Sequence, residues 1–138
     1  MSMDCKTLVR RWFEEVWNQK RDASIDELMA ADGVFHGLGP DPVHGPDNFR
    51  LFRGAFLDAL PDINVHIDEV IEEDCIGAVR YTCTATHKGA GLGFPATNRP
   101  VTFTGMAFVR IEGGKAAEAW NNFDQFSLFK QIGAIQPT

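Results

Sequence analysis

Residues 100–112 and 115–126 read PVTFTGMAFVRIE and KAAEAWNNFDQF, and only Gly113-Gly114 separates them. Side chains of a strand point alternately to its two sides, and both segments repeat with a period of two. A pair of glycines adopts the left-handed backbone that a tight hairpin turn requires. The two segments therefore predict a long β-hairpin that ends the main part of the chain.

The same two-residue period extends upstream of this hairpin. Residues 63–73 and 76–87 predict two further long strands, joined by a turn at Glu73-Asp74. Residues 89–99 are rich in Gly and Pro, which indicates a longer loop. A short strand is expected at 33–38, and a short apolar helix at 126–132 closes the chain.

The first 60 residues have helical spacing instead. Apolar residues recur at intervals of three and four from Cys5 to Trp17, which predicts an amphipathic helix. Ser24-Ile25-Asp26-Glu27 resembles a capping box that begins a second helix, and Asn18 is expected to bridge the junction. A third helix starts at Pro46, carries a stripe of Phe residues and stops at Pro61.

Helices first and a run of long strands afterwards is the order of an α+β fold. We expect a single domain over residues 1–138, in which the three N-terminal helices pack against a strongly curved sheet. Such packing leaves a hollow between the concave side of the sheet and the helices, and hollows of this kind often bind small molecules.

Composition narrows the function. The chain has 138 residues, 44% hydrophobic and 23% charged, and a formal net charge of −6, which argues against a nucleic-acid surface. Eleven Phe and three Trp provide an aromatic core with material left to line a cavity. No apolar run is long enough to cross a membrane, and residues 1–4 do not begin a targeting segment. Cys5 and Cys83 lie in apolar patterns that indicate buried, reduced thiols, so a cytoplasmic protein is expected.

Metal and phosphate sites are not expected. The four histidines (His36, His44, His66 and His87) have no ligand-type spacing. The glycines of residues 89–93 precede a strand and not a helix, so they lack the helix N-terminus that holds phosphate. This segment is interpreted as a flexible loop that covers the mouth of a pocket.

Residues 118–126, EAWNNFDQF, carry the candidate chemistry. By strand alternation Trp120, Asn122 and Asp124 share one side. If this is the concave side, Asp124 is a carboxylate in an aromatic hollow, where burial raises the pKa and suits proton transfer near neutral pH. The alternative is that Asp124 caps the closing helix. Spacing does not separate the two.

Other candidate pocket residues have structural alternatives. His36 and His87 are either hydrogen-bonded wall residues or pocket contacts, and Trp17 belongs to the core or to the pocket wall. Tyr81 and Cys83 form the more apolar side of their strand and are expected to point inward, whereas Arg80 points out.

Several short motifs occur in one colinear order. They are Val16-Trp17-Asn18, Phe35-His36-Gly37, Thr86-His87-x-Gly89 with Gly93-x-Pro95-x-Thr97, and Trp120-x-x-x-Asp124 continuing to Gln131 and Gly133. Together they resemble the SnoaL-like polyketide cyclases of the nuclear transport factor 2-like superfamily. The resemblance implies a cone-shaped α+β barrel with a curved mixed sheet, a homodimer, and activity without cofactor or metal. It also implies intramolecular aldol cyclisation of a polyketide ester, with Asp124 as the acid/base. For such a mechanism we expect His36, His87 or Asn122 to donate a hydrogen bond to the developing enolate.

The chain departs from this pattern in two places. Gly91 and Ala96 stand where relatives often have Phe and Pro, and residues 105–108 are apolar where some cyclases carry a polar residue. Oxyanion assistance from that strand is therefore not expected.

Two other functions are weighed beside the cyclase: a non-catalytic protein that binds a small apolar ligand, and an isomerase or epoxide hydrolase on the same fold. A homodimer is expected through the convex side of the sheet, with Phe123 as a candidate contact.

Overall fold

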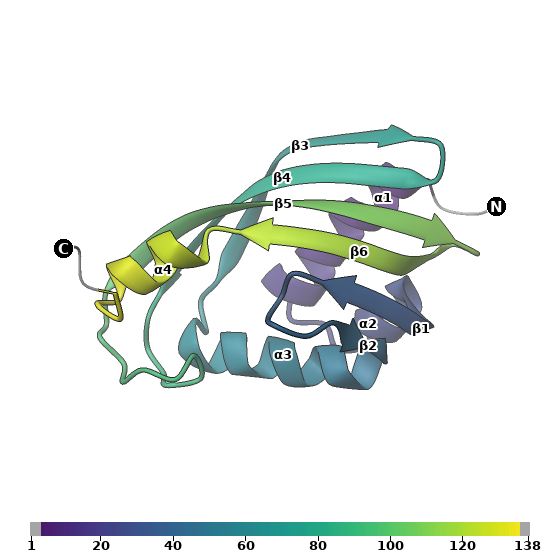
Figure 1. Cartoon of the computed structure of the whole chain (residues 1–138). Coiled ribbons are helices and arrows are strands. Elements are labelled where there is room, and N and C mark those ends of the chain that lie inside the picture. Colours follow the sequence, from purple (N-terminus) through teal and green to yellow (C-terminus); the bar gives the residue numbers. More distant parts are fainter. Residues whose placement is uncertain (1–3, 136–138) are drawn as a thin grey trace.

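The computed structural model describes residues 4–135, and the expectation for the first three residues falls outside this range. Figure 1 shows helices at both ends of the chain and a curved sheet between them. In chain order the elements are α1 (Cys5–Arg11), the π-helix η1 (Trp12–Asn18), α2 (Ala23–Leu28), β1 (Met29–His36), β2 (Val43–His44), α3 (Gly45–Ala59), β3 (Asn64–Glu73), β4 (Ile76–Thr86), β5 (Pro100–Glu112), β6 (Lys115–Phe123) and α4 (Gln125–Gln131).

The six strands form one mixed sheet in the order β2-β1-β6-β5-β4-β3. Strand β1 is parallel to β6, and the other neighbouring strands are antiparallel. The turn between β5 and β6 has Gly113 at φ 62° and Gly114 at φ 77°, and the β3–β4 turn has Asp74 at φ 55°. These left-handed residues match the twist of the strands that they join, so both predicted hairpins are confirmed.

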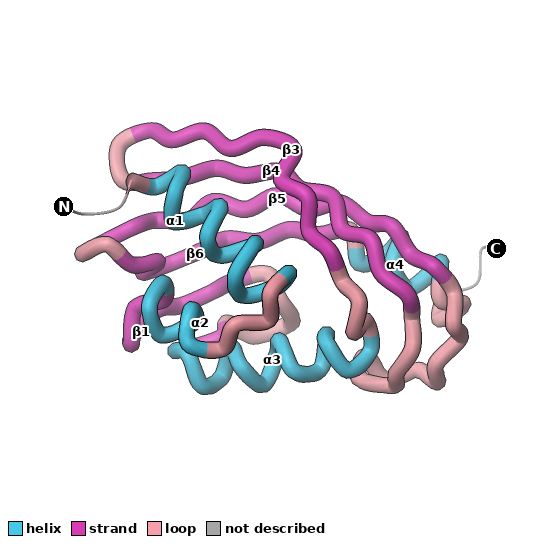
Figure 2. The backbone as a smooth tube through the Cα atoms, turned by 180° about the vertical axis from the view of Figure 1, so that it is seen from behind, coloured by secondary structure: helices cyan, strands magenta, loops and turns pink. Residues whose placement is uncertain are grey.

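Helices α1, α2 and α3 lie on one side of the sheet, as the view from behind shows (Figure 2). Their inward side chains meet those of β1 and β3–β6 in a core of aliphatic and aromatic residues. The Trp12 ring lies 5.4 Å from Phe35 and 4.9 Å from Phe49, so this one side chain joins the first helical segment to both β1 and α3. The predicted α+β fold with a curved mixed sheet is confirmed.

Some helix and strand boundaries differ from those that the local sequence signals predicted. The first helix changes at Trp12 into the π-helix η1, and Met29, expected at the end of the second helix, begins β1. Ser24 does not form the predicted capping box, because its hydroxyl bonds to Glu15 at 2.6 Å. The two-residue strand β2 was not predicted, since two residues give no periodic signal.

Asn18 has the bridging role that its position suggested. Its side-chain oxygen accepts from the Val65 amide at 2.7 Å, and its side-chain nitrogen donates to the Val65 carbonyl at 2.9 Å. The end of η1 is thereby tied to β3.

The glycine-rich segment packs against α3 instead of forming a flexible cover. Lys88 donates its amide to Ala59 at 2.8 Å. A Cβ atom on Gly89 would overlap with the carbonyl of Asp58, and one on Gly91 with the carbonyl of Ala55. Glycine is needed because two backbones come into contact there. No helix within residues 4–135 is long and apolar enough to cross a membrane.

Candidate functional site

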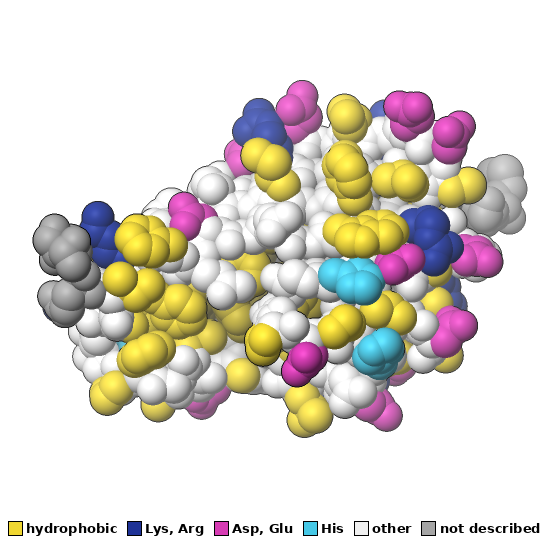
Figure 3. Space-filling view, in the orientation of Figure 1, with side chains coloured by type: hydrophobic (Ala, Val, Ile, Leu, Met, Phe, Trp, Pro, Cys, Tyr) yellow, Lys and Arg dark blue, Asp and Glu magenta, His cyan; other side chains and the backbone are white. Residues whose placement is uncertain are grey.

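A cavity of about 530 Å³ lies between the concave side of the sheet and the helices. Figure 3 shows hydrophobic side chains recessed in the hollow between α3 and the sheet. The lining residues come from η1, α3, five strands, the segment after β1 and the segment before β3. They are Trp12, Phe13, Trp17, Phe35, Leu38, Phe49, Phe52, Phe56, Ile63, Val65, Tyr81, Cys83, Phe103, Asn121 and Phe123.

The π-helix explains how two tryptophans reach this cavity. A π-helix closes i→i+5 hydrogen bonds, so residues five apart lie above one another, unlike in an α-helix. Trp12 and Trp17 are five apart and both line the cavity. Continued α-helical winding would turn one of them away from the sheet.

Helix α3 forms the opposite wall with its phenylalanine stripe. The Trp17 ring meets Phe49, Phe52 and Phe56 at centroid distances of 6.1, 6.3 and 6.0 Å, each in an edge-to-face arrangement. Aromatic rings prefer this geometry, and it holds each ring in a defined orientation. The wall is therefore preorganised for a flat apolar molecule.

Alternation along the strands sets the floor of the cavity. Tyr81 and Cys83 of β4 point inward, as predicted, and so do Phe103 of β5 and Asn121 and Phe123 of β6. A second cavity of about 320 Å³ lies toward α1 and is also lined by Asn121. The two cavities share Trp12, Phe13 and Phe35 as well, so together they outline an elongated space.

Only three of the lining side chains are polar: Tyr81, Cys83 and Asn121. Burial raises the pKa of Tyr81 above its ordinary value and raises the pKa of Cys83 to about 12. Both groups are therefore neutral near pH 7, and neither is a competent base there. Within residues 4–135, no carboxylate or histidine lines this cavity, and no cluster of three or more His, Cys, Asp or Glu residues fits a metal ion.

The prediction that Asp124 lies at the deep end of the cavity is wrong. Asp124 is exposed, and its carboxylate accepts from the Ser127 amide at 2.9 Å as the N-cap of α4. Strand β6 ends at Phe123, which points inward, so the chain turns into α4 with Asp124 outside. The capping alternative from the sequence is the arrangement found.

Trp120 and Asn122 share that outward orientation and are also exposed, so their predicted place in the cavity is wrong as well. His36 is half-buried on the outer side of β1, where its Nε2 lies 2.7 Å from Glu118 and its ring stacks on Trp120 at 5.8 Å. The hydrogen bond with His36 lowers the pKa of Glu118. Together these side chains form a surface cluster.

His87 is fully buried but is not among the residues that line the cavity. Its Nδ1 lies 3.0 Å from the Thr97 hydroxyl and 3.3 Å from the Thr97 amide, which anchors the loop after β4. Of the six side chains singled out from the sequence, Trp17 alone lines the cavity.

Asp124, Trp120 and Asn122 were misplaced because the wrong side of β6 was expected to face the cavity. The sequence nevertheless contained a signal for the correct side. Ala119, Asn121 and Phe123 carry less polar surface than Trp120, Asn122 and Asp124 do, since the latter set includes a carboxylate. The pairing of β5 with β6 shifts near Ala116, so Ala116 and Ala119 are both buried although they are three apart. A β-bulge of this kind reverses the alternation and is hard to predict from sequence.

Comparison with protein families identifies the family of the chain. The family model described as SnoaL-like polyketide cyclase matches residues 7–132. The chain belongs to the SnoaL-like polyketide cyclase family. This membership confirms the resemblance seen in the sequence motifs. No functionally curated protein matches the chain.

Solved structures of family-like proteins share the fold. A candidate SnoaL-like polyketide cyclase from Jannaschia sp. CCS1 superposes with a TM-score of 0.86 at 19% identity, over 96% of this chain and 92% of that one. AclR from Streptomyces galilaeus, a candidate hydroxylase, gives a TM-score of 0.82 at 26% identity, over 96% and 83%. A protein with a ketosteroid isomerase-like fold from Catenulispora acidiphila was solved in complex with trimethylamine. It gives a TM-score of 0.76 at 16% identity, over 98% of this chain and 100% of that one. A shared fold does not by itself determine the reaction.

Proposed function

We propose that this SnoaL-like protein binds an uncharged, largely flat apolar molecule of the polyketide type in its aromatic cavity. One observation carries the proposal: ten of the fifteen lining residues are aromatic, and the rest include only two polar side chains, Cys83 and Asn121. Aromatic walls contribute large contact areas, and a few polar groups then fix the orientation of the ligand.

The charge of the cavity lining supports an uncharged ligand. No Lys or Arg lines the cavity, so a carboxylate or phosphate there would lose its hydration without gaining an opposite charge. An ester or ketone is desolvated at much lower cost. A polyketide ester, the substrate class suggested by the family, meets this condition.

Acid–base aldol cyclisation without a cofactor is the second candidate, and the family match favours it. In this reaction Asp124 removes the acidic proton between two carbonyl groups and later protonates the alkoxide formed on ring closure. The exposed position of Asp124 gives this step no support, and Tyr81 and Cys83 cannot replace it as a base. An isomerase or epoxide hydrolase needs further acids in the cavity, and the lining contains no carboxylate.

Ligand binding can be tested with tryptophan fluorescence. Trp12 and Trp17 line the cavity, whereas Trp120 is outside, so a Trp120→Phe background reports on the cavity alone. Titration with 2-acetylnaphthalene is expected to give saturable quenching. Phe52→Ala removes a wall contact and should weaken binding about tenfold. The matched control Leu51→Ala changes the next residue of α3, which is 75% exposed, and should leave binding unchanged.

The proposal fails if the naphthalene ketone does not bind saturably, or if Leu51→Ala and Phe52→Ala weaken binding equally. The cyclase candidate has a separate test. With a polyketide ester that the protein turns over, Asp124→Asn should lower turnover by about 10²–10⁴-fold if Asp124 transfers the proton. Undiminished turnover removes Asp124 from the mechanism and leaves ligand binding as the function.

A further inference from the structure

No side chain or backbone group within the described residues bonds to the hydroxyl of Tyr81. Only 7% of the Tyr81 surface is exposed, and its ring packs on Phe13 at 4.8 Å in the cavity wall. A tyrosine hydroxyl in apolar surroundings usually finds a hydrogen-bond partner, either in the protein or in a molecule beside it. The missing partner therefore points to a molecule that enters the cavity.

Gly105 directs this hydroxyl across the cavity floor. Tyr81 and Gly105 are directly paired between β4 and β5, and Gly105 pairs in turn with Phe123 of β6. A Cβ atom on Gly105 would overlap with the Tyr81 hydroxyl oxygen and with the ring carbon Cζ that carries it. The ring thus lies over β5, one strand away from β6, where Asn121 and Phe123 line the cavity. Without a side chain at position 105, the hydroxyl reaches the centre of the floor.

The other polar groups of the cavity are less suited to donate a hydrogen bond. The Asn121 amide nitrogen already donates to the His36 carbonyl at 2.9 Å, and a cysteine thiol is a weak donor. Burial raises the pKa of Tyr81, so its hydroxyl keeps its proton at neutral and mildly alkaline pH. Tyr81 therefore brings an unpartnered hydroxyl donor to the floor of an otherwise largely apolar cavity.

We propose that Tyr81 is the residue that selects a carbonyl-bearing ligand, by donating its hydroxyl proton to a ketone or ester oxygen placed above Gly105. The flat apolar part of the ligand lies against the phenylalanines of α3 and Trp17. This inference rests on the proposed function, since it requires that the cavity binds an uncharged apolar molecule, and it adds the polar group that such a ligand must carry.

Two probes of nearly the same shape separate the hydrogen bond from apolar contact. They are 2-acetylnaphthalene and 2-isopropenylnaphthalene, in which a CH₂ group replaces the carbonyl oxygen. Their affinities are measured by fluorescence in the wild-type chain and in Tyr81→Phe, which removes only the hydroxyl. The wild-type chain should prefer the ketone by about 3–10-fold, as expected for one net hydrogen bond. In Tyr81→Phe this preference should disappear, because only ketone binding weakens.

Phe13→Leu is the matched control, since it changes the ring packed on Tyr81 but keeps the hydroxyl. This variant should bind both probes more weakly and should retain the preference for the ketone. Equal binding of both probes to the wild-type chain, or a ketone preference that survives in Tyr81→Phe, overturns the role of Tyr81 while ligand binding stands. Failure of both probes to bind the wild-type chain overturns the proposed function itself, and this inference with it.

Discussion

Gly105 and Tyr81 depend on each other for their conformations. The aromatic ring occupies the space that a side chain at position 105 would need, so Gly105→Ala should force the buried ring out of place. Overpacking of this kind costs about 1–3 kcal/mol. In a Tyr81→Leu background the ring is absent, and the same Gly105→Ala change should cost little or stabilise the strand.

Urea unfolding of the wild-type chain, both single variants and the double variant measures this coupling directly. A coupling energy near zero, with the costs of the two single variants simply adding, contradicts the proposed overlap.

Asp124 illustrates how a motif residue can serve structure. Its carboxylate caps α4 through the Ser127 amide. Asp124→Ala should therefore lower the free energy of unfolding by about 1 kcal/mol, whereas Asp124→Asn should change it little, because Asn caps a helix nearly as well. Neither variant should alter the affinity for 2-acetylnaphthalene, since Asp124 is exposed outside the cavity. Loss of ligand affinity in Asp124→Asn would place the carboxylate at the site after all.

At the residue scale, the sequence correctly predicted which side chains point inward where one side of a strand is clearly more apolar than the other. Tyr81 and Cys83 were correctly placed because Arg80 and Thr82 mark the opposite side. Strand β6 has aromatic and amide residues on both sides, so the only signal for its orientation was the carboxylate of Asp124 on one of them. The role that we propose for Tyr81 could not be predicted, because it depends on Gly105 of the neighbouring strand.

At the scale of elements, the long periodic segments were predicted almost to their ends. Strand β5 was expected at 100–112 and is found as Pro100–Glu112. The π-helix was not predicted, because its pattern of apolar residues is compatible with an α-helix over the first turns. Tertiary packing favours the wider turn of the π-helix, because this turn brings both Trp12 and Trp17 into the cavity wall.

The junction of η1 and α2 is held by a network of charges. Glu15 accepts from Arg11 at 2.6 Å and from the Ser24 hydroxyl at 2.6 Å. The hydrogen bond from Arg11 is the main reason that the pKa of Glu15 falls to about 2. Because this pKa lies below that of the unfolded chain, the network stabilises the fold fully above about pH 4.5, and the stabilisation is lost as the pH falls toward 2.

Glu15→Gln should therefore lower the free energy of unfolding at pH 7 by about 1–2 kcal/mol. Between pH 4.5 and 2 it should also lose less stability than the wild-type chain. Urea titrations at several pH values give both quantities. Parallel acid profiles for the two proteins would show that Glu15 does not carry this pH dependence.

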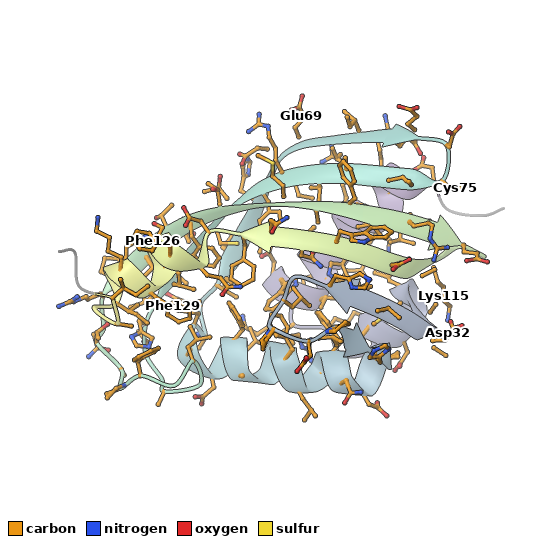
Figure 4. All side chains as sticks on the ribbon, in the orientation of Figure 1. Asp32, Glu69, Cys75, Lys115, Phe126 and Phe129 are labelled. Atoms are coloured by element: carbon orange, nitrogen blue, oxygen red, sulfur yellow. The ribbon has the colours of Figure 1, made fainter. Side chains whose placement is uncertain are left out.

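At the scale of the whole molecule, one side of the sheet is covered by helices and the other is open. Figure 4 labels Phe126 and Phe129 on α4 near one end of the sheet, and Cys75 and Lys115 near its other end. Between these ends the outer side carries a continuous cross-strand row over five strands, composed of Ile71, Ala78, Phe108, Trp120 and His36. Phe108 is 58% exposed, and Met106 beside it is 64% exposed. Figure 3 shows hydrophobic side chains gathered over this part of the sheet.

This outer apolar surface fits a second copy of the chain. A two-fold axis through the row would place Phe108 and Trp120 of both copies together and bury the exposed rings. The contact expected from the sequence, Phe123, is wrong for this surface because its ring packs inside on Phe56 at 5.6 Å. The self-complementary row therefore predicts a homodimer that uses the other side of β5 and β6.

Phe108→Glu should convert this dimer to a monomer, because two carboxylates would meet near the axis in an apolar contact. Light scattering at micromolar concentration should give twice the chain mass of 15.3 kDa for the wild-type protein and the single mass for the variant. Leu51→Glu places the same charge on a more exposed apolar residue of α3 and should leave the dimer intact. Since the cavity lies on the opposite side of the sheet, Phe108→Glu should still bind 2-acetylnaphthalene. A monomeric wild-type chain would contradict the interface, and a monomeric Leu51→Glu variant would move it to the helices.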